Sequence, residues 1–372
     1  MDTTRRRFIS ATTAALAGSA VSTAPLGAAL AAPAVVSGQP DIRWRMTSSF
    51  PRQLDSIYGA AQMLARYVNE ATDGHFQIQT FPAGEIVPGM QALDAVSSGA
   101  VECAQSSTYF FTGKNPALAF GTGVPFGFNT RQQMSWWNFG GGGEIINDIL
   151  QRYKVLAIPA GNSGCQMGGF FRKPLETMDD LKGLKFRIAG LGGEVLARLG
   201  VVPQQVPPGD VYAALERGTI DAAEFVGPYD DEKFGLVRVA KYYYYPGWWE
   251  GGALLHLLVN QDHWVSLPKN YQTILRLACA AADNWMLEKY DSVNPPALRR
   301  LVQQGAELRP FPPVIMEAAY KAAQSLYTEL SAQNADFRKA WDSMKTIRNE
   351  QLVWMQIGEY AFDSFNLRTR GK

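Results

Sequence analysis

The alternation of strand-like and helix-like segments over residues 42–105 constrains the fold more than any other feature of this chain. Residues 42–47 alternate apolar and polar side chains, residues 58–71 carry apolar side chains at helical spacing, and residues 76–81 alternate again. A short helix at 89–98 and a strand at 101–105 continue the series. Strands separated by helices of this length predict βαβ units and a parallel sheet.

A second series of strands and helices begins at residue 155. We expect strands at 155–159, 184–188, 201–206 and 220–225 with helices between them, and long helices at 271–292, 295–305, 314–333 and 336–367. A chain of 372 residues is long enough for roughly two cores. Two series and this length predict two α/β domains, with long helices at the C-terminus.

Composition excludes some classes of function. The net charge is +1 at pH 7, which argues against a nucleic-acid-binding protein, because such proteins carry a basic face. The three Cys are widely spaced and there are only three His, so neither a disulfide framework nor a His-based metal site is indicated.

The first 31 residues have the pattern of an export signal. Arg5, Arg6, Phe8 and Ile9 precede an Ala-rich run, and residues 29–31 offer a cleavage site of small residues. A membrane anchor is the alternative, but the run falls short of the roughly 20 strongly apolar residues that a span requires. We therefore expect a twin-arginine signal peptide and a mature protein in a bacterial periplasm.

Arg187 is the most informative polar residue. It lies inside a predicted strand, between Phe186 and Ile188. A buried guanidinium needs an anion, and its planar fork suits a carboxylate. The partner is either a ligand carboxylate or a structural Asp or Glu, and the residues alone leave both open.

Glu224 and Glu250 are candidate cation ligands. Each precedes or follows an aromatic residue and lies close to Gly, in a region that also holds Gln166 and Phe225. Hard cations take oxygen ligands from carboxylates, amides and carbonyls. The alternative is that both Glu side chains are solvated in loops.

Other runs receive simpler interpretations. Glycines 140–143 lack the Lys of a phosphate-binding loop and are read as a turn, and residues 230–232 are read as a charged turn rather than a metal loop. Tyr109 and the pair Trp248–Trp249 are candidate walls of a pocket. No motif of a hydrolase, metalloprotease or nucleotide-binding enzyme is visible.

Five segments carry a resemblance to a known family: 113–120, 124–127, 181–188, 224–231 and 247–252. The chain resembles the periplasmic solute-binding proteins of tripartite ATP-independent periplasmic (TRAP) transporters, in the branch that binds α-keto acids and related monocarboxylates. The likeness covers nearly all of the mature chain. It implies an α/β, two-lobe periplasmic binding protein fold (type II-like) with a hinge and long C-terminal helices.

The resemblance also implies roles for residues. Arg187 matches the arginine that takes the solute carboxylate. A sodium or calcium ion, bound with the solute, is expected among four residues: Gln166, Glu224, Phe225 and Glu250. Solute contacts are further expected from Gln166, Asn162, Tyr109, Phe225 and Trp249. Phe225 stands where the branch often has Trp, which puts the identity of the solute in doubt unless only its carbonyl is used.

The expected organisation follows from the same likeness. Lobe I comprises residues 40–162 with about 252–300, lobe II comprises 163–251 with about 301–330, and 331–372 form a helical extension. The implied partners are a small carboxylate solute and the TRAP membrane permease subunits. The C-terminal helix resembles one exchanged between protomers, so a homodimer through it is a further expectation.

Two other classes of function compete with a binding protein. One is a secreted metal-dependent enzyme that acts on a carboxylate, which would convert any bound solute. The other is a ligand sensor whose partner is a signalling domain. Turnover of solute would distinguish the enzyme from the binding protein, and a neighbouring permease gene would favour transport over both alternatives.

Overall fold

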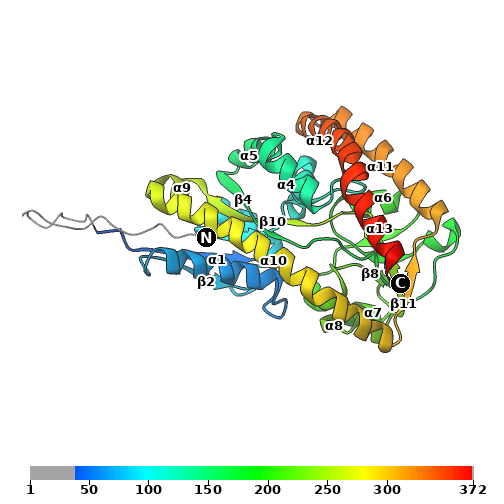
Figure 1. Ribbon diagram of the computed structural model, residues 1–372. Helices are drawn as coiled ribbons and strands as arrows, with labels where there is room; N and C mark the ends of the chain where they lie inside the picture. The colour runs from blue at the N-terminus through cyan, green and yellow to red at the C-terminus, as the bar shows by residue number, and fades with distance from the viewer. Residues whose placement is uncertain (1–37, 371–372) are drawn as a thin grey trace, which may run out of the picture. The chain divides into compact units, whose positions relative to one another are not determined.

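The computed structural model describes residues 38–370. From Pro40 onward the chain folds into two sheets flanked by helices (Figure 1). The predicted signal peptide, residues 1–31, lies outside the described residues. No helix between residues 38 and 370 combines the length and the apolar character needed to cross a membrane.

The first sheet has the strand order β2-β1-β3-β10-β4. Its strands are β1 (Ile42–Ser48), β2 (Phe76–Phe81), β3 (Cys103–Ser106), β4 (Val155–Asn162) and β10 (Leu254–Asn260). β1 pairs in parallel with β2 and β3, as the βαβ pattern predicts, whereas β10 is antiparallel to both of its neighbours. The parallel part of the sheet is confirmed, and the insertion of β10 was not predicted.

Helices cover both faces of the first sheet. On one face, α1 (Ile57–Ala71) and α10 (Lys269–Gln303) pack against side chains such as Met46, Ile158 and Leu257. On the other face lie α2 (Ala92–Ser97), α4 (Thr130–Phe139) and α5 (Gly142–Gln151), against Ala104, Ala157 and Leu258. Burial on two faces explains the apolar runs of β4 and β10.

The second sheet has the order β11-β9-β5-β8-β6-β7. Its strands are β5 (Gly169–Phe171), β6 (Lys185–Arg187), β7 (Val202–Gln204), β8 (Ala222–Ala223), β9 (Tyr242–Tyr245) and β11 (Glu307–Pro310). Successive side chains point to opposite faces. Phe170 and Tyr243 therefore pack toward α7 (Val211–Glu216), whereas Phe171 and Tyr244 pack toward α6 (Gly190–Ala197) and Phe311.

The chain passes between the sheets three times. β4 leads into β5, β9 leads back into β10, and α10 leads to β11. α10 contacts β4 and α1 along part of its length and α8 (Pro228–Phe234) along another part (Figure 1). The remaining short helices are α3 (Ala119–Thr122) and α9 (Gln261–Ser266).

The predicted break between two helices at residues 292–295 is wrong. α10 continues through Pro295 and Pro296 as one helix. Tertiary contacts hold it on both sides of the prolines, because Asn294 accepts a hydrogen bond from the Tyr229 amide and Arg300 pairs with Glu232. These contacts offset the backbone hydrogen bonds that the prolines remove.

The interpretation of residues 230–232 as a charged turn is also wrong. These residues belong to α8, and the Asp230 and Asp231 side chains are buried. The Tyr290 hydroxyl donates to Asp230, and the Tyr243 hydroxyl donates to Asp231 at 2.5 Å. Two tyrosines distant in sequence thus stabilise carboxylates that a local reading assigns to solvent.

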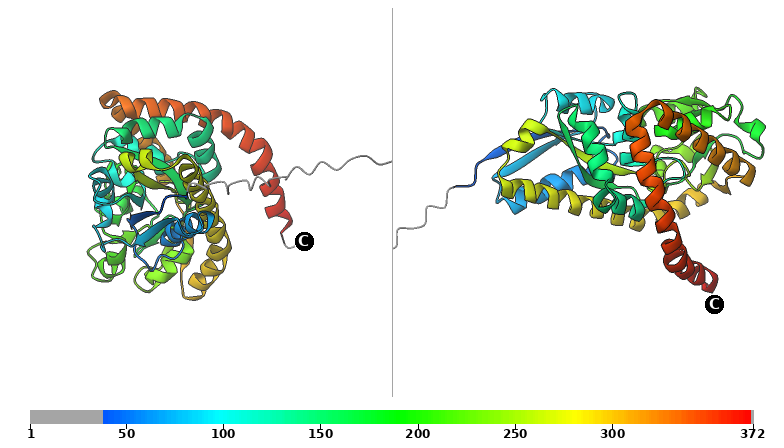
Figure 2. Two further views of the ribbon diagram at one scale, coloured as in Figure 1. Left: turned by 90° about the vertical axis from the view of Figure 1, so that its left-hand side faces the viewer. Right: turned by 90° about the horizontal axis from the view of Figure 1, so that it is seen from above.

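The C-terminal part is almost entirely helical, as predicted. α11 (Pro313–Gln333) and α12 (Ala335–Met355) pack against each other, and a π-helical turn (Gln356–Tyr360) leads into α13 (Ala361–Thr369). Both views in Figure 2 show this last helix, in red, projecting from the helices that precede it. The end of α12, the π-helical turn and α13 together expose large apolar side chains: Trp354, Ile357, Tyr360, Phe362, Phe365 and Leu367.

Candidate solute and cation site

The candidate site lies where two of the crossing connections meet the segment after β8. Backbone hydrogen bonds join them: Gly247 donates to the Gln166 carbonyl at 3.0 Å, and Met167 donates to the Val226 carbonyl at 3.0 Å. The Ser163 amide donates to the Ala253 carbonyl at 3.1 Å. Main-chain hydrogen bonds therefore hold the segments around residues 163–167, 226, 247 and 253 next to one another.

Arg187 ends β6 and is 6% exposed. Its Nε donates to the Val206 carbonyl at 3.3 Å, and its Nη1 donates to the Glu224 carbonyl and lies 3.5 Å from Glu224 Oε2. The guanidinium carbon is 5.4 Å from the centre of the Phe225 ring. Within residues 38–370, Nη2 has no hydrogen-bond acceptor, so one edge of the fork is available to an anion.

Glu224 and Glu250 are both buried, at 2% and 5% exposure. Burial raises the pKa of Glu224 to about 7, although Arg187 opposes the shift. Burial, followed by the charge of Glu224, raises the pKa of Glu250 well above its ordinary value. Two carboxylates share one guanidinium, so a bound cation would relieve their mutual repulsion.

Gln166 supplies a further oxygen to this region. Its Nε2 donates to Ser163 Oγ at 2.9 Å, while its buried Oε1 has no donor among the described residues. Ser163 Oγ also accepts from the Ala253 amide at 2.8 Å, which fixes the side chain that orients Gln166.

The oxygen set fits a hard cation. The two carboxylates and the unpartnered Gln166 amide oxygen are ligands of the kind that sodium and calcium prefer. Across residues 38–370 no group of three or more His, Cys, Asp or Glu could hold a metal ion, so amide and carbonyl oxygens would have to complete any coordination shell.

Two cavities adjoin Arg187. The smaller, of about 20 Å³, is closed by residues from both sheets, among them Phe50, Ser107, Ser163, Gln166 and Phe225. The larger, of about 730 Å³, opens beside it and is bordered mainly by apolar or small residues such as Met90, Ile188 and Pro203. Tyr109, Phe110 and Arg187 line both cavities, so they form the boundary between an inner chamber and a wider cleft.

Of the predicted residues, Tyr109, Gln166, Arg187 and Phe225 line one or both cavities. Four others line neither cavity among the described residues: Asn162, Glu224, Trp249 and Glu250. Tyr109 is half-buried at the boundary, where burial and then the charges of Glu250 and Glu224 raise its pKa well above the ordinary value. Asn162 is buried at the end of β4, where its Oδ1 accepts from Gly164 N at 3.0 Å and Thr130 Oγ1 at 3.1 Å.

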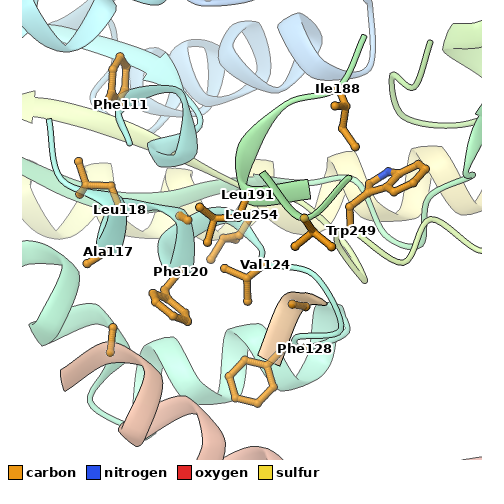
Figure 3. Close-up of a cluster of buried hydrophobic side chains, with 14 of the residues drawn as sticks. Phe111, Ala117, Leu118, Phe120, Val124, Phe128, Ile188, Leu191, Trp249 and Leu254 are labelled. Atoms are coloured by element: carbon orange, nitrogen blue, oxygen red, sulfur yellow. The ribbon is translucent and has the colours of Figure 1, made fainter. Parts of the chain in front are cut away.

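Trp249 lies in the hydrophobic core. Its ring packs against Phe186 at 5.4 Å and Phe311 at 5.7 Å between ring centres. Figure 3 shows it among buried apolar side chains, near Ile188. Its place in the fold supports a packing role rather than contact with solute.

Sequence reasoning missed several residues of the inner chamber. Ser163 and Ser107 line it with Phe50, Ile57, Val226 and Leu255. Ser163 lies between β4 and β5, close to the polar residues Asn162 and Gln166, so its polarity was a signal. The apolar residues gave none, because their types are equally typical of any core.

Residues 47–334 match the family described as bacterial extracellular solute-binding protein, family 7. The chain is 48% identical over 331 residues to a monocarboxylate 2-oxoacid-binding periplasmic protein of Nostoc sp., covering 89% of this chain and 91% of the relative.

Solved structures show the same fold. A TRAP transporter solute-binding protein from Bordetella bronchiseptica, a dimer with copurified calcium and picolinate, has a TM-score of 0.87 and 47% identity, covering 89% of this chain and 98% of that one. A TRAP periplasmic solute-binding protein from Pseudoalteromonas atlantica, with bound sodium and pyruvate, has a TM-score of 0.85 and 36% identity, covering 87% and 99%. The expected α/β fold with long C-terminal helices is confirmed.

Proposed function

Because this chain belongs to the bacterial extracellular solute-binding proteins of family 7, we propose that it is the periplasmic solute-binding component of a TRAP transporter. Its solute is a small monocarboxylate with a 2-oxo or 2-hydroxy group, bound together with a sodium or calcium ion. The 2-oxoacid-binding relative from Nostoc sp. and the related structures with bound pyruvate or picolinate support this solute class.

One observation carries the proposal. The buried Arg187 pairs with Glu224, shares a chamber with Gln166 and acts electrostatically on the buried Glu250. Among the described residues, Arg187 Nη2 has no acceptor and Gln166 Oε1 has no donor. The guanidinium suits a carboxylate, whereas the oxygens suit a cation. A solute with a carboxylate and a neighbouring oxygen can satisfy both at once.

Each residue then has a role in binding. Arg187 takes the solute carboxylate through its free edge, and Tyr109 bounds the chamber beside it. Gln166, Glu224, Glu250 and the Phe225 carbonyl would hold the cation. The cation supplies positive charge that offsets the two carboxylates and attracts the solute oxygen.

The chamber lies between segments of the two sheets, which supports closure of two lobes on the solute. In this proposal, residues 40–162 with about 252–300 form one lobe, and 163–251 with about 301–330 form the other. The protein binds and releases its solute without turnover and delivers it to the membrane permease subunits. Export to the periplasm through the twin-arginine pathway accounts for the Arg pattern at the N-terminus.

A homodimer through the C-terminal extension, residues 331–372, belongs to the same proposal. α13 exposes apolar side chains such as Phe362 and Phe365, at 69% and 60%, which a second copy would bury. The Bordetella bronchiseptica structure is a dimer, which supports this assembly.

Thermal shift of the purified protein tests the binding function. Pyruvate, lactate and picolinate are each added with sodium, with calcium and after chelation. A solute at one hundred times its dissociation constant should stabilise the fold by about 2.7 kcal/mol. If none of these solutes raises the melting temperature with either cation, the monocarboxylate proposal is wrong.

A further inference from the structure

A cluster of polar and charged side chains, which line neither cavity, joins α8 to the segment before α1. It consists of Asp55, Tyr229, Lys233 and Lys289, named here the Asp55 cluster. We infer that Asp55 is a positioning residue that slows the release of solute by tying α8 to the segment before α1. The inference rests on the proposed solute-binding function.

One carboxylate serves three donors in this cluster. The Tyr229 hydroxyl donates to Asp55 Oδ2 at 3.1 Å, and Lys233 Nζ pairs with Oδ1. Lys289 Nζ lies 3.1 Å from Oδ2 and donates to the Asp55 carbonyl at 2.7 Å. The Asp55 side chain remains 51% exposed, whereas Lys233 and Lys289 are 27% and 22% exposed.

The donors and the acceptor belong to different parts of the fold. Asp55 stands just before α1, which packs on β1 and β2 of the first sheet. Tyr229 and Lys233 lie on α8, which begins directly after the site segment 224–227. Phe234, at the end of α8, packs in the same cluster as Phe170 and Tyr243 of the second sheet.

Beneath the Asp55 cluster lies an apolar contact between the same two sides. Phe50, Leu54 and Ile57 pack in one hydrophobic cluster with Phe225 and Val226. Phe50, Ile57, Phe225 and Val226 also line the inner chamber. Any motion that opens the chamber by separating these side chains must also pull α8 away from Asp55.

Asp55 itself lines neither cavity among the described residues. Its effect on solute is therefore indirect, through the position of α8 and of Glu224 and Phe225 just before it. Removing the carboxylate also leaves Lys233 and Lys289 close together without their anion. Burial and then Lys289 already lower the pKa of Lys233 to about 8, so the two ammonium groups repel each other.

The expected size of the effect is moderate. A single exposed ion pair contributes little, whereas this cluster combines two ion pairs and a hydroxyl. We expect Asp55→Asn to raise the dissociation rate constant of pyruvate by about five- to twenty-fold. The association rate constant should stay within about two-fold, because that variant leaves the chamber unchanged.

Stopped-flow fluorescence with pyruvate and calcium measures both rate constants. Asp55→Glu should recover at least part of the slow release, and Lys233→Gln should accelerate release from the other side of the same pair. The matched control is Asp94→Asn, which breaks the 2.6 Å ion pair between Asp94 of α2 and Lys114. This pair does not involve α8. Unchanged dissociation in Asp55→Asn, or an equal acceleration in Asp94→Asn, overturns the inference.

A second measurement separates this inference from the proposed function. In protein without solute, Asp55→Asn should accelerate amide hydrogen exchange across α8, residues 228–234, relative to both the wild type and Asp94→Asn. If the wild type binds no monocarboxylate, the proposed function fails and the exchange result decides the role of Asp55. Equal exchange across α8 in all three proteins overturns it.

Discussion

Replacing Arg187 by Lys keeps the positive charge of the site but removes the planar fork. The guanidinium now satisfies the Val206 and Glu224 carbonyls through Nε and Nη1, which leaves Nη2 for the solute. A single ammonium group at the end of a flexible stem cannot serve all three acceptors in these directions. Loss of one charged hydrogen bond costs about 1.5–3 kcal/mol, so the dissociation constant should rise roughly 10- to 150-fold.

Isothermal titration calorimetry with pyruvate in excess calcium measures this change. Arg172→Lys is the control, because Arg172 follows β5 in the same sheet and its side chain is exposed. The control should bind like the wild type. A folded Arg187→Lys protein whose dissociation constant stays within two-fold of the wild type would refute the role of Arg187 as the carboxylate ligand.

Three further predictions test other parts of the structure. Burial raises the pKa of Asp230 to about 6, so the native protein keeps a proton that the unfolded chain releases near pH 4, and the free energy of unfolding falls as pH rises from about 4 to 6. Urea denaturation across this pH window should show a smaller fall for Asp230→Asn than for the wild type. An equal fall in both proteins would exclude Asp230 as its source. Deleting residues 356–372 removes most of the exposed apolar side chains of the extension, so light scattering after gel filtration should report a dimer for the full chain and a monomer for the truncated chain; equal oligomeric states would reject this interface. Phe225→Trp should keep the cation dependence of binding but change the ratio of pyruvate to picolinate affinity, because the backbone carbonyl is retained and only the ring changes. Loss of the cation dependence, measured by calorimetry, would contradict the role of the Phe225 carbonyl.

The polar centre of the site could be predicted because it breaks local rules. An Arg inside an apolar strand is unusual, and Arg187 is indeed buried against Glu224. The sequence left open whether the partner of Arg187 is a structural carboxylate or a solute carboxylate. The structure is compatible with both, because Glu224 pairs with Nη1 while Nη2 has no acceptor among the described residues. The strands and helices up to residue 105 followed from periodicity, because each repeats a local pattern.

Features that depend on distant residues could not be predicted in this way. Asp230 and Asp231 look like a solvated run until Tyr290 and Tyr243 are placed beside them, and nothing within a short window announces those hydroxyls. The continuity of α10 through Pro295 likewise depends on contacts with α8. Asp55 meets Lys233 across 178 residues, so only the folded arrangement shows the pair.

Trp249 illustrates a different limit. The residue type and its neighbours fit a pocket wall and a core position equally well, because an aromatic ring suits both. Its ring packs against Phe186 and Phe311 in the core, whereas Phe225, the residue after Glu224, borders the inner chamber.

The position of β10 between β3 and β4 has a consequence for the order of folding. The first sheet is divided until residues 254–260 are available, although its other strands are complete by residue 162. A growing chain that stops before Leu254 presents the unpaired edges of β3 and β4, which are prone to pair with other chains. Closing this gap joins segments about 150 residues apart, from β3 at Cys103 to β10 at Leu254, and such non-local pairing is slow. Synthesis of the whole second sheet except β11 therefore precedes completion of the first, and a chaperone that shields those edges would be needed longest during that interval.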